Sequence, residues 1–186
     1  MIIGVVGPLC AGKDSFAFLL QNKGFALFSF GDVIRKEMHE KGLVLERTEI
    51  QKYGNFIRSS EGAGAIARRI LQLIGIEKGN YIVQGFRNPA EVEAFMAQKD
   101  FILVALSASQ EARFERMKQR KREKDPTTFE AFKKIDDMEL LGVGQNEDGF
   151  NIGECMKMAN FKINNDGSIL DLEEKINILV QEIKGD

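Results

Sequence analysis

Residues 7–15, Gly-Pro-Leu-Cys-Ala-Gly-Lys-Asp-Ser, follow the short apolar run Ile2–Val6 and precede an amphipathic segment that extends to about Lys23. Glycines allow the backbone N–H groups of such a loop to turn towards a phosphate, and the N-terminus of the following helix adds positive potential. A glycine-rich loop with a lysine after its last glycine, placed between a strand and a helix, predicts a nucleotide phosphate site. The predicted site consists of Gly7, Cys10, Ala11, Gly12, Lys13, Asp14 and Ser15.

Two residues of this loop bear on how a nucleotide and its metal ion are held. Lys13 is placed to reach the β- and γ-phosphates as a movable point charge. Asp14 stands where this motif usually has a serine or threonine that contacts Mg²⁺, and Ser15 follows it. Since a carboxylate is a good ligand for a hard cation, we expect Asp14 to hold Mg²⁺ directly or through water. The alternative is that Asp14 only caps the helix.

Strand and helix candidates alternate along the chain. Strands are expected at residues 2–6, 25–30, 81–83, 101–106 and 160–163. Helices are expected at 13–23, 33–41, 48–74 with a break near Gly62, from Pro89 onward, and at 111–123, 128–141 and 170–183, with a loop at 142–153. This order is typical of βαβ units, so it predicts one α/β domain over residues 1–186, with a five-stranded parallel sheet between two layers of helices.

Composition narrows the function classes. The 186 residues carry a formal net charge of −2, which argues against a dedicated nucleic-acid-binding protein. No apolar run approaches the roughly 18 residues that span a bilayer, and the N-terminus does not have the pattern of a signal peptide. We therefore expect a cytoplasmic protein with no nucleic-acid or membrane partner. Two cysteines and one histidine do not predict a disulfide framework or a zinc site.

Cys10 lies inside the loop, where the helix N-terminus lowers the pKa of a nearby thiol. It is either an oxidation-sensitive group or, as we favour, a small residue that fills the loop. Phe30, Phe56 and Phe86 are candidates to stack on a bound base, although core packing is favoured for each.

Three further segments carry arginines in patterns suited to phosphate chemistry. Ser29-Phe-Gly-Asp-Val-Ile-Arg35 follows the second predicted strand, and Gln84-Gly-Phe-Arg-Asn-Pro-Ala-Glu-Val92 ends the third. A guanidinium binds phosphate bidentately, and ligands bind at the carboxyl ends of strands in open α/β sheets. In the charged segment 113–132, helical spacing places Arg113, Arg116 and Arg120 on one face. Solvated helix surfaces remain the alternative for these arginines.

In this order, the segments resemble the nucleoside monophosphate kinase-like family of P-loop proteins, which includes small kinases related to adenylate kinase and dephospho-CoA kinase. The Gly-Lys-Asp loop is similar to the loop of deoxynucleoside monophosphate kinases. The resemblance covers essentially the whole chain. It implies a three-layer P-loop fold with acceptor-binding helices at 32–75 and a lid at 113–130.

The resemblance also implies roles for individual residues. Arg35 and Arg87 would hold the acceptor phosphate, with Asp32 beside them. Catalytic charge stabilisation would come from Lys13, Arg116, Arg120 and Arg122. Residues 159–168 would flank the adenine of ATP, the alternative being an ordinary strand–turn–helix connection. The family's aspartate at the end of the third strand is Gln84 here, so the arrangement of Mg²⁺ stays open.

The expected activity is ATP-dependent phosphoryl transfer to a small phosphorylated acceptor, in first place a (deoxy)nucleoside monophosphate, by a monomer or homodimer. One alternative is a dephospho-CoA kinase-like enzyme that phosphorylates a hydroxyl and uses Asp32 as its base. The other alternative is a nucleotide-binding regulatory protein with weak ATP hydrolysis. It stays open because Gln84 stands where the family has an aspartate.

Overall fold

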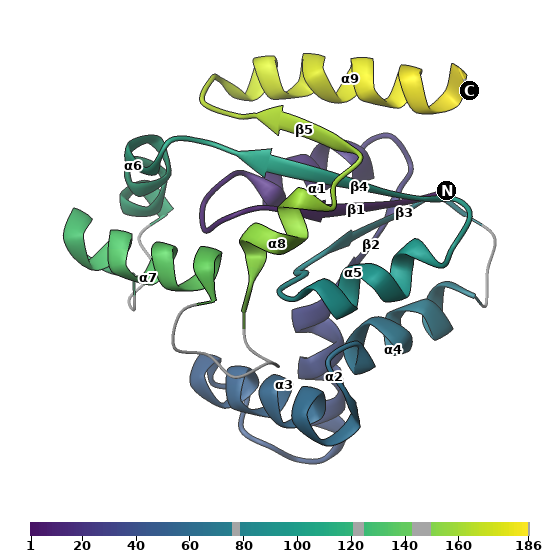
Figure 1. Cartoon of the computed structure of the whole chain (residues 1–186), viewed down its shortest axis with the longest axis vertical. Helices are drawn as coiled ribbons and strands as arrows, with labels where there is room; N and C mark the ends of the chain where they lie inside the picture. The colour runs from purple at the N-terminus through teal and green to yellow at the C-terminus, as the bar shows by residue number, and fades with distance from the viewer. Residues whose placement is uncertain (76–78, 121–124, 143–149, 186) are drawn as a thin grey trace.

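The computed structural model describes residues 1–75, 79–120, 125–142 and 150–185, and it contains one parallel sheet (Figure 1). The strand order is β2-β3-β1-β4-β5, and each neighbouring pair is parallel. This confirms the predicted five-stranded parallel sheet. Its strands are β1 (Ile2–Val6), β2 (Ala26–Ser29), β3 (Tyr81–Gln84), β4 (Phe101–Ser107) and β5 (Phe161–Asn164).

Helices cover both faces of the sheet, as predicted. They are α1 (Lys13–Gln21), α2 (Phe30–Glu40), α3 (Arg47–Glu61), α4 (Ala65–Ile74), α5 (Pro89–Met96), α6 (Gln110–Arg120), α7 (Phe129–Leu141), α8 (Ile152–Lys157) and α9 (Ile169–Gly185). The central strand β1 is buried along its whole length. Ile3 and Val5 pack against α1 and α9, whereas Ile2 and Val6 belong to the core formed with α2, α4, α5 and α8. Successive side chains of β1 thus point to opposite faces of the sheet and belong to two separate hydrophobic cores.

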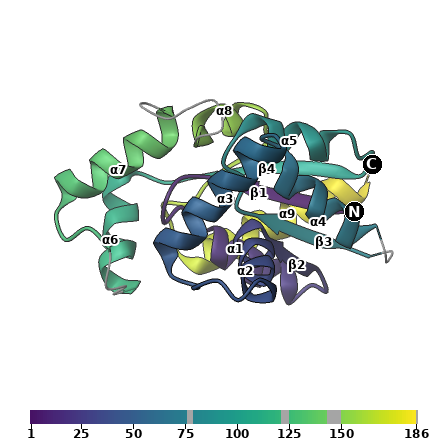
Figure 2. The same ribbon diagram turned by 90° about the horizontal axis from the view of Figure 1, so that it is seen from below.

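Helices α6 and α7 lie beyond the end of the sheet towards which β4 points (Figures 1 and 2). They share a small apolar cluster of Phe114, Met117 and Phe132, against which Leu9 and Cys10 of the phosphate loop pack. The predicted lid segment is therefore attached to the loop that it is expected to cover.

Two helix predictions need correction. The helix expected from residue 33 already begins at Phe30, directly after β2, and Phe30 is buried in the core. In the region expected to be a loop, α8 forms at its end because the Asn151 side chain caps it by accepting from the Glu154 N–H, while Ile152 and Cys155 are buried. Residues 143–149 of that predicted loop lie outside the described residues. The predicted break near Gly62 is confirmed, since Gly62 has a φ of 94° between α3 and α4.

Candidate functional site

A cleft of about 1080 Å³ lies at the carboxyl ends of the parallel strands. Its lining comes from the phosphate loop, from the residues directly after β2 and β3, from α3, α6 and α7, and from the segment after β5. Parallel strands deliver the loops that follow them to one edge of a sheet, which is where ligands bind in open α/β folds. The cleft therefore brings together segments that are far apart in sequence.

The phosphate loop is held in shape by close contacts that only glycine permits. A Cβ at Gly7 would collide with the Leu106 carbonyl oxygen, and a Cβ at Gly12 would collide with the Asn165 side chain. Gly12 also has a φ of 103°, in the left-handed region. Asn165 Nδ2 donates to the Ala11 carbonyl oxygen at 2.8 Å. Ala11 is consequently buried behind the loop, while the cleft is lined by Gly7, Cys10, Gly12, Lys13, Asp14 and Ser15.

Lys13 folds back onto its own loop. Its Nζ donates to the carbonyl oxygens of Gly7 at 2.7 Å and Pro8 at 2.8 Å. Burial lowers the pKa of Lys13 to about 8, and the carboxylates of Glu139 and Asp14 act in the opposite direction. A bound phosphate would likewise favour the charged amine, because an opposite charge nearby stabilises it.

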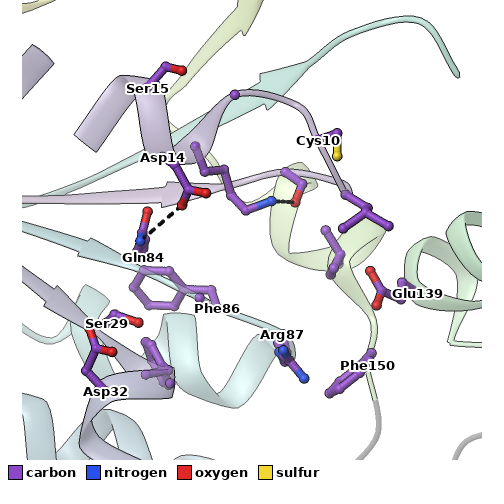
Figure 3. A pocket seen from close by; sticks show the side chains of 18 of the residues that line it. Cys10, Asp14, Ser15, Ser29, Asp32, Gln84, Phe86, Arg87, Glu139 and Phe150 are labelled. Carbon is purple, nitrogen blue, oxygen red and sulfur yellow. Dashed lines mark hydrogen bonds between the residues drawn. The ribbon is translucent and has the colours of Figure 1, made fainter. Parts of the chain in front are cut away.

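Asp14 and Gln84 both line the cleft, and their side chains lie next to each other (Figure 3). Gln84 Nε2 donates to Asp14 Oδ1 at 3.4 Å. The N-cap position of α1 is Gly12 and has no side-chain hydrogen bond, so Asp14 does not cap the helix. Gln84 Oε1 is buried and has no hydrogen-bond partner among the described residues.

The two predicted acceptor arginines line the other part of the cleft. Arg35 Nη1 lies 2.5 Å from Asp32 Oδ1, in an ion pair that is largely exposed. The Arg87 guanidinium lies 4.1 Å from the centre of the Phe150 ring, and the two side chains face each other in Figure 3. The Asn151 N–H donates to the Arg87 carbonyl oxygen at 2.6 Å. The structure thus brings Arg35, Asp32 and Arg87 to one cleft, as predicted from the sequence.

A buried ion pair that the sequence did not reveal supports this part of the cleft. Arg58 of α3 also lines the cleft, and its Nε donates to Glu91 Oε1 at 2.8 Å. Glu91 Oε2 accepts from the Arg87 N–H at 2.7 Å, which ties α3 to the backbone of the acceptor segment. Burial raises the pKa of Glu91, against the lowering effect of Arg58. Phe150 and Glu139 are further lining residues that sequence patterns did not single out.

The lid arginines divide into two groups. Arg116 Nη2 donates to the carbonyl oxygens of Asn165 at 2.5 Å and Gly167 at 3.4 Å, and Arg116 lines the cleft. Arg120 also lines it and forms a bidentate pair with Asp125, at 2.6 and 2.7 Å.

Arg113, predicted on the same face, is instead buried in an ion pair with Asp136 and donates to the Leu9 carbonyl oxygen at 3.1 Å. It does not line the cleft, because its guanidinium is packed between α6, α7 and the phosphate loop. Arg122 lies outside the described residues.

Cys10 does not have the low pKa expected at a helix N-terminus. Burial raises the pKa of its thiol, and Arg120 only partly opposes this effect. Its packing beside the lid cluster fits the favoured role of a loop filler. Phe30 and Phe86 belong to the core, with ring centres 5.0 Å apart, and both also line the cleft. Phe56 is 59% exposed and does not line the cleft.

Comparison with known proteins places the chain and its fold. Residues 3–141 match the model of a family described as AAA domain. The chain is 36% identical over 180 residues to a UPF0200/UPF0201 protein of Archaeoglobus fulgidus, covering 94% of this chain but only 53% of that relative. It is 32% identical over 189 residues to a UPF0200 protein of Pyrococcus horikoshii, covering 98% of this chain and 97% of the relative.

Solved structures of P-loop kinases share the fold. Dephospho-CoA kinase from Campylobacter jejuni superposes with a TM-score of 0.58 at 18% identity, covering 99% of this chain and 98% of that one. Shikimate kinase from Acinetobacter baumannii in complex with shikimate gives 0.58 at 20% identity, covering 97% and 93%. In the described ranges, no helix combines the length and apolar character needed to cross a bilayer. By its sequence matches, the chain belongs to the AAA domain family and to the UPF0200 proteins.

Proposed function

We propose that this protein is a kinase that transfers the γ-phosphoryl group of ATP to a small phosphorylated acceptor, a nucleoside or deoxynucleoside monophosphate. One observation carries the proposal: a single cleft is lined both by the phosphate loop and by the arginines of the segments after β2 and β3. Phosphoryl transfer requires two phosphate-binding regions that face one space, since catalysis consists mainly of positioning and charge stabilisation.

In the proposed reaction, an oxygen of the acceptor phosphate attacks the γ-phosphorus in line with the leaving group. The bond from the γ-phosphorus to the bridging oxygen breaks, and ADP leaves. Lys13 and the loop N–H groups hold the donor phosphates, while Arg116 and Arg120 approach the transferring group from the lid. A phosphate acceptor is ionised at neutral pH and needs no strong base. Asp32, paired with Arg35, then orients an arginine, and the reaction does not require it as a base.

Residues 32–75 and 113–130 receive distinct roles in this proposal. The first segment contains α2, α3 and α4 and contributes Arg35 and Arg58 to the cleft, so it forms the acceptor-binding region. The second contributes Arg116 and Arg120 and packs on the phosphate loop, so it serves as a lid that excludes water from the transfer.

The residues present fit a Mg²⁺ ion that enters together with the nucleotide. Within the described part of the chain, no three His, Cys, Asp or Glu side chains come together to form a metal site. Mg²⁺ in kinases typically uses one or two carboxylates plus substrate phosphates and water, and does not need an all-protein cage. Asp14 supplies one such carboxylate in the first turn of α1, and the ion would neutralise charge on the β- and γ-phosphates.

A panel of acceptors tests the proposal. ADP formation is measured with ATP and Mg²⁺ in the presence of each nucleoside monophosphate, each deoxynucleoside monophosphate and dephospho-CoA. We expect strong stimulation by one or a few monophosphates, with the corresponding diphosphate as product. Turnover only with dephospho-CoA would replace the proposal with a hydroxyl kinase, and ADP formation that no acceptor stimulates would replace it with a regulatory ATPase.

A further inference from the structure

Two buried side-chain atoms have no hydrogen-bond partner within the described ranges, namely Gln84 Oε1 and Arg116 Nη1. Both residues line the cleft. Buried polar atoms in folded proteins are almost always paired, because an unpaired one loses its hydration without compensation. These two atoms therefore mark positions where a ligand or a bound water would complete the hydrogen bonding.

One of the two atoms needs a hydrogen-bond acceptor and the other needs a donor. Arg116 Nη1 is a donor, and any phosphate oxygen can accept from it. Gln84 Oε1 is an acceptor, and the phosphates of a nucleotide offer only acceptors when ionised. Nucleotide phosphates therefore satisfy Arg116 but leave Gln84 unsatisfied.

The orientation of the Gln84 amide is set by its neighbour. Its Nε2 donates to Asp14 Oδ1, and turning the amide over would place two oxygen atoms against each other. The backbone of Gln84 is also held on both sides, in register with Val5 of β1 and Ser29 of β2. The acceptor atom is thus held in a defined place beside the Asp14 carboxylate.

A water bound to a divalent cation is the donor that fits this place. Mg²⁺ usually keeps several of its waters when it binds to a protein, and a cation polarises those waters into good donors. We propose that Gln84 is a positioning residue for the hydrated cation of the metal–nucleotide complex, with Oε1 accepting from a metal-bound water while Asp14 carries the negative charge. This inference rests on the proposed function, since the nucleotide phosphates supply the remaining ligands.

The rival partner for Gln84 Oε1 is Lys13, which has a third N–H besides the two that it donates to the loop. The rival makes a different prediction. If Lys13 were the donor, loss of Oε1 would change nucleotide binding even without a metal ion. If the metal-bound water is the donor, the loss matters only when the cation is present.

The test measures Mn²⁺ binding in the presence of saturating ADP, by the loss of the free Mn²⁺ signal in electron paramagnetic resonance, and measures ADP binding separately in EDTA. The variants are Gln84→Leu, which removes both the acceptor Oε1 and the Nε2 donor to Asp14, and Gln84→Glu, which keeps an acceptor oxygen and adds a carboxylate beside Asp14. Gln21→Leu, on the exposed end of α1, is the matched control. Thermal unfolding in EDTA shows whether each variant folds, and Gln84→Met replaces the leucine variant if it does not.

We expect Gln84→Leu to weaken Mn²⁺ binding roughly 10-fold, the effect typical of lost outer-sphere partners, and to leave ADP binding in EDTA unchanged. Gln84→Glu should strengthen Mn²⁺ binding, because a second carboxylate can join the cation. The inference would be overturned by any of three results: an Mn²⁺ affinity of the leucine variant equal to that of the unaltered protein, a change of Mn²⁺ affinity in the same direction in both variants, or weaker ADP binding in EDTA. If the unaltered protein binds no ADP in either condition, the proposed function itself fails, and the inference fails with it.

Discussion

The two ends of the cleft are built in different ways. At the proposed donor end, the phosphate loop is shaped mainly by its backbone: Gly7 and Gly12 permit contacts that a Cβ would prevent, and Asn165 holds the loop through the Ala11 carbonyl oxygen. At the acceptor end, side chains from separate elements hold one another, as Phe150 does for Arg87. The donor end is suited to the phosphates that all nucleotides share, whereas the acceptor end is where we expect selectivity to arise.

Loss of the Lys13 amine should produce the largest effect, because it removes the positive charge that we propose holds the donor phosphates. We expect Lys13→Ala to lower kcat/KM for phosphoryl transfer by about 10²–10³-fold, as for other groups that stabilise charge in a transition state. A coupled assay of ADP formation measures it. Lys23→Ala, on the exposed turn after α1, is the control, and an equal loss in that variant would remove the assigned role.

Removal of Arg87 should affect the two substrates unequally. We expect Arg87→Ala to raise the KM for the acceptor by roughly 10- to 100-fold, the range of a lost charged hydrogen bond, while the KM for ATP stays within about twofold. Initial rates with each substrate varied in turn separate the two constants. Arg68→Ala, an exposed arginine of α4, controls for lost charge. Comparable increases in both KM values would contradict a division of the cleft into two ends.

Replacement of Phe150 should raise the KM for the acceptor, as loss of Arg87 does, but by a smaller factor. Phe150→Leu keeps an apolar side chain and removes the ring beneath the guanidinium, which is worth about 1 kcal/mol. We expect roughly a fivefold rise in acceptor KM, with ATP KM unchanged. Phe18→Leu, exposed on α1, is the control. An effect on ATP alone would show that Phe150 does not act through Arg87.

The Cys10 thiol should have the smallest effect on activity. Because burial raises its pKa, little thiolate is present near neutral pH, and the thiolate is the reactive form. Iodoacetamide should modify Cys10 more slowly than a free thiol at pH 8, with a rate that rises at more alkaline pH, as followed by mass spectrometry. Cys10→Ser should retain activity within about twofold. Rapid modification at neutral pH would instead support the oxidation-sensitive alternative.

Local patterns in the sequence predicted that a strand, a glycine-rich loop and a helix follow one another at the start of the chain. The loop, its strand and its helix are contiguous, so the spacing of glycines and lysine carries the geometry. The parallel sheet was predicted from the alternation of strands and helices, and the position of Arg87 shortly after β3 predicted that it lines the cleft at the carboxyl ends of the strands.

Contacts between distant segments were not predictable in this way. Arg58 of α3 contacts Glu91 of α5, and Phe150 contacts Arg87 in the segment between β3 and α5, only after folding has brought these elements together. Helical spacing placed Arg113 on the same face as Arg116. Spacing does not reveal that Arg113 forms a buried ion pair with Asp136 of α7. A short helix such as α8 depends on one cap and on two buried side chains, which composition alone does not show.

Simultaneous binding is the most direct test of a cleft with two phosphate-binding ends. The protein is saturated with a non-hydrolysable ATP analogue and Mg²⁺, then titrated by calorimetry with the nucleoside monophosphate that gives the fastest turnover. Our account predicts that the monophosphate binds once per chain without displacing the analogue, and that Arg87→Ala weakens only the monophosphate. Competitive displacement of the analogue by the monophosphate would show a single phosphate site and would contradict the account.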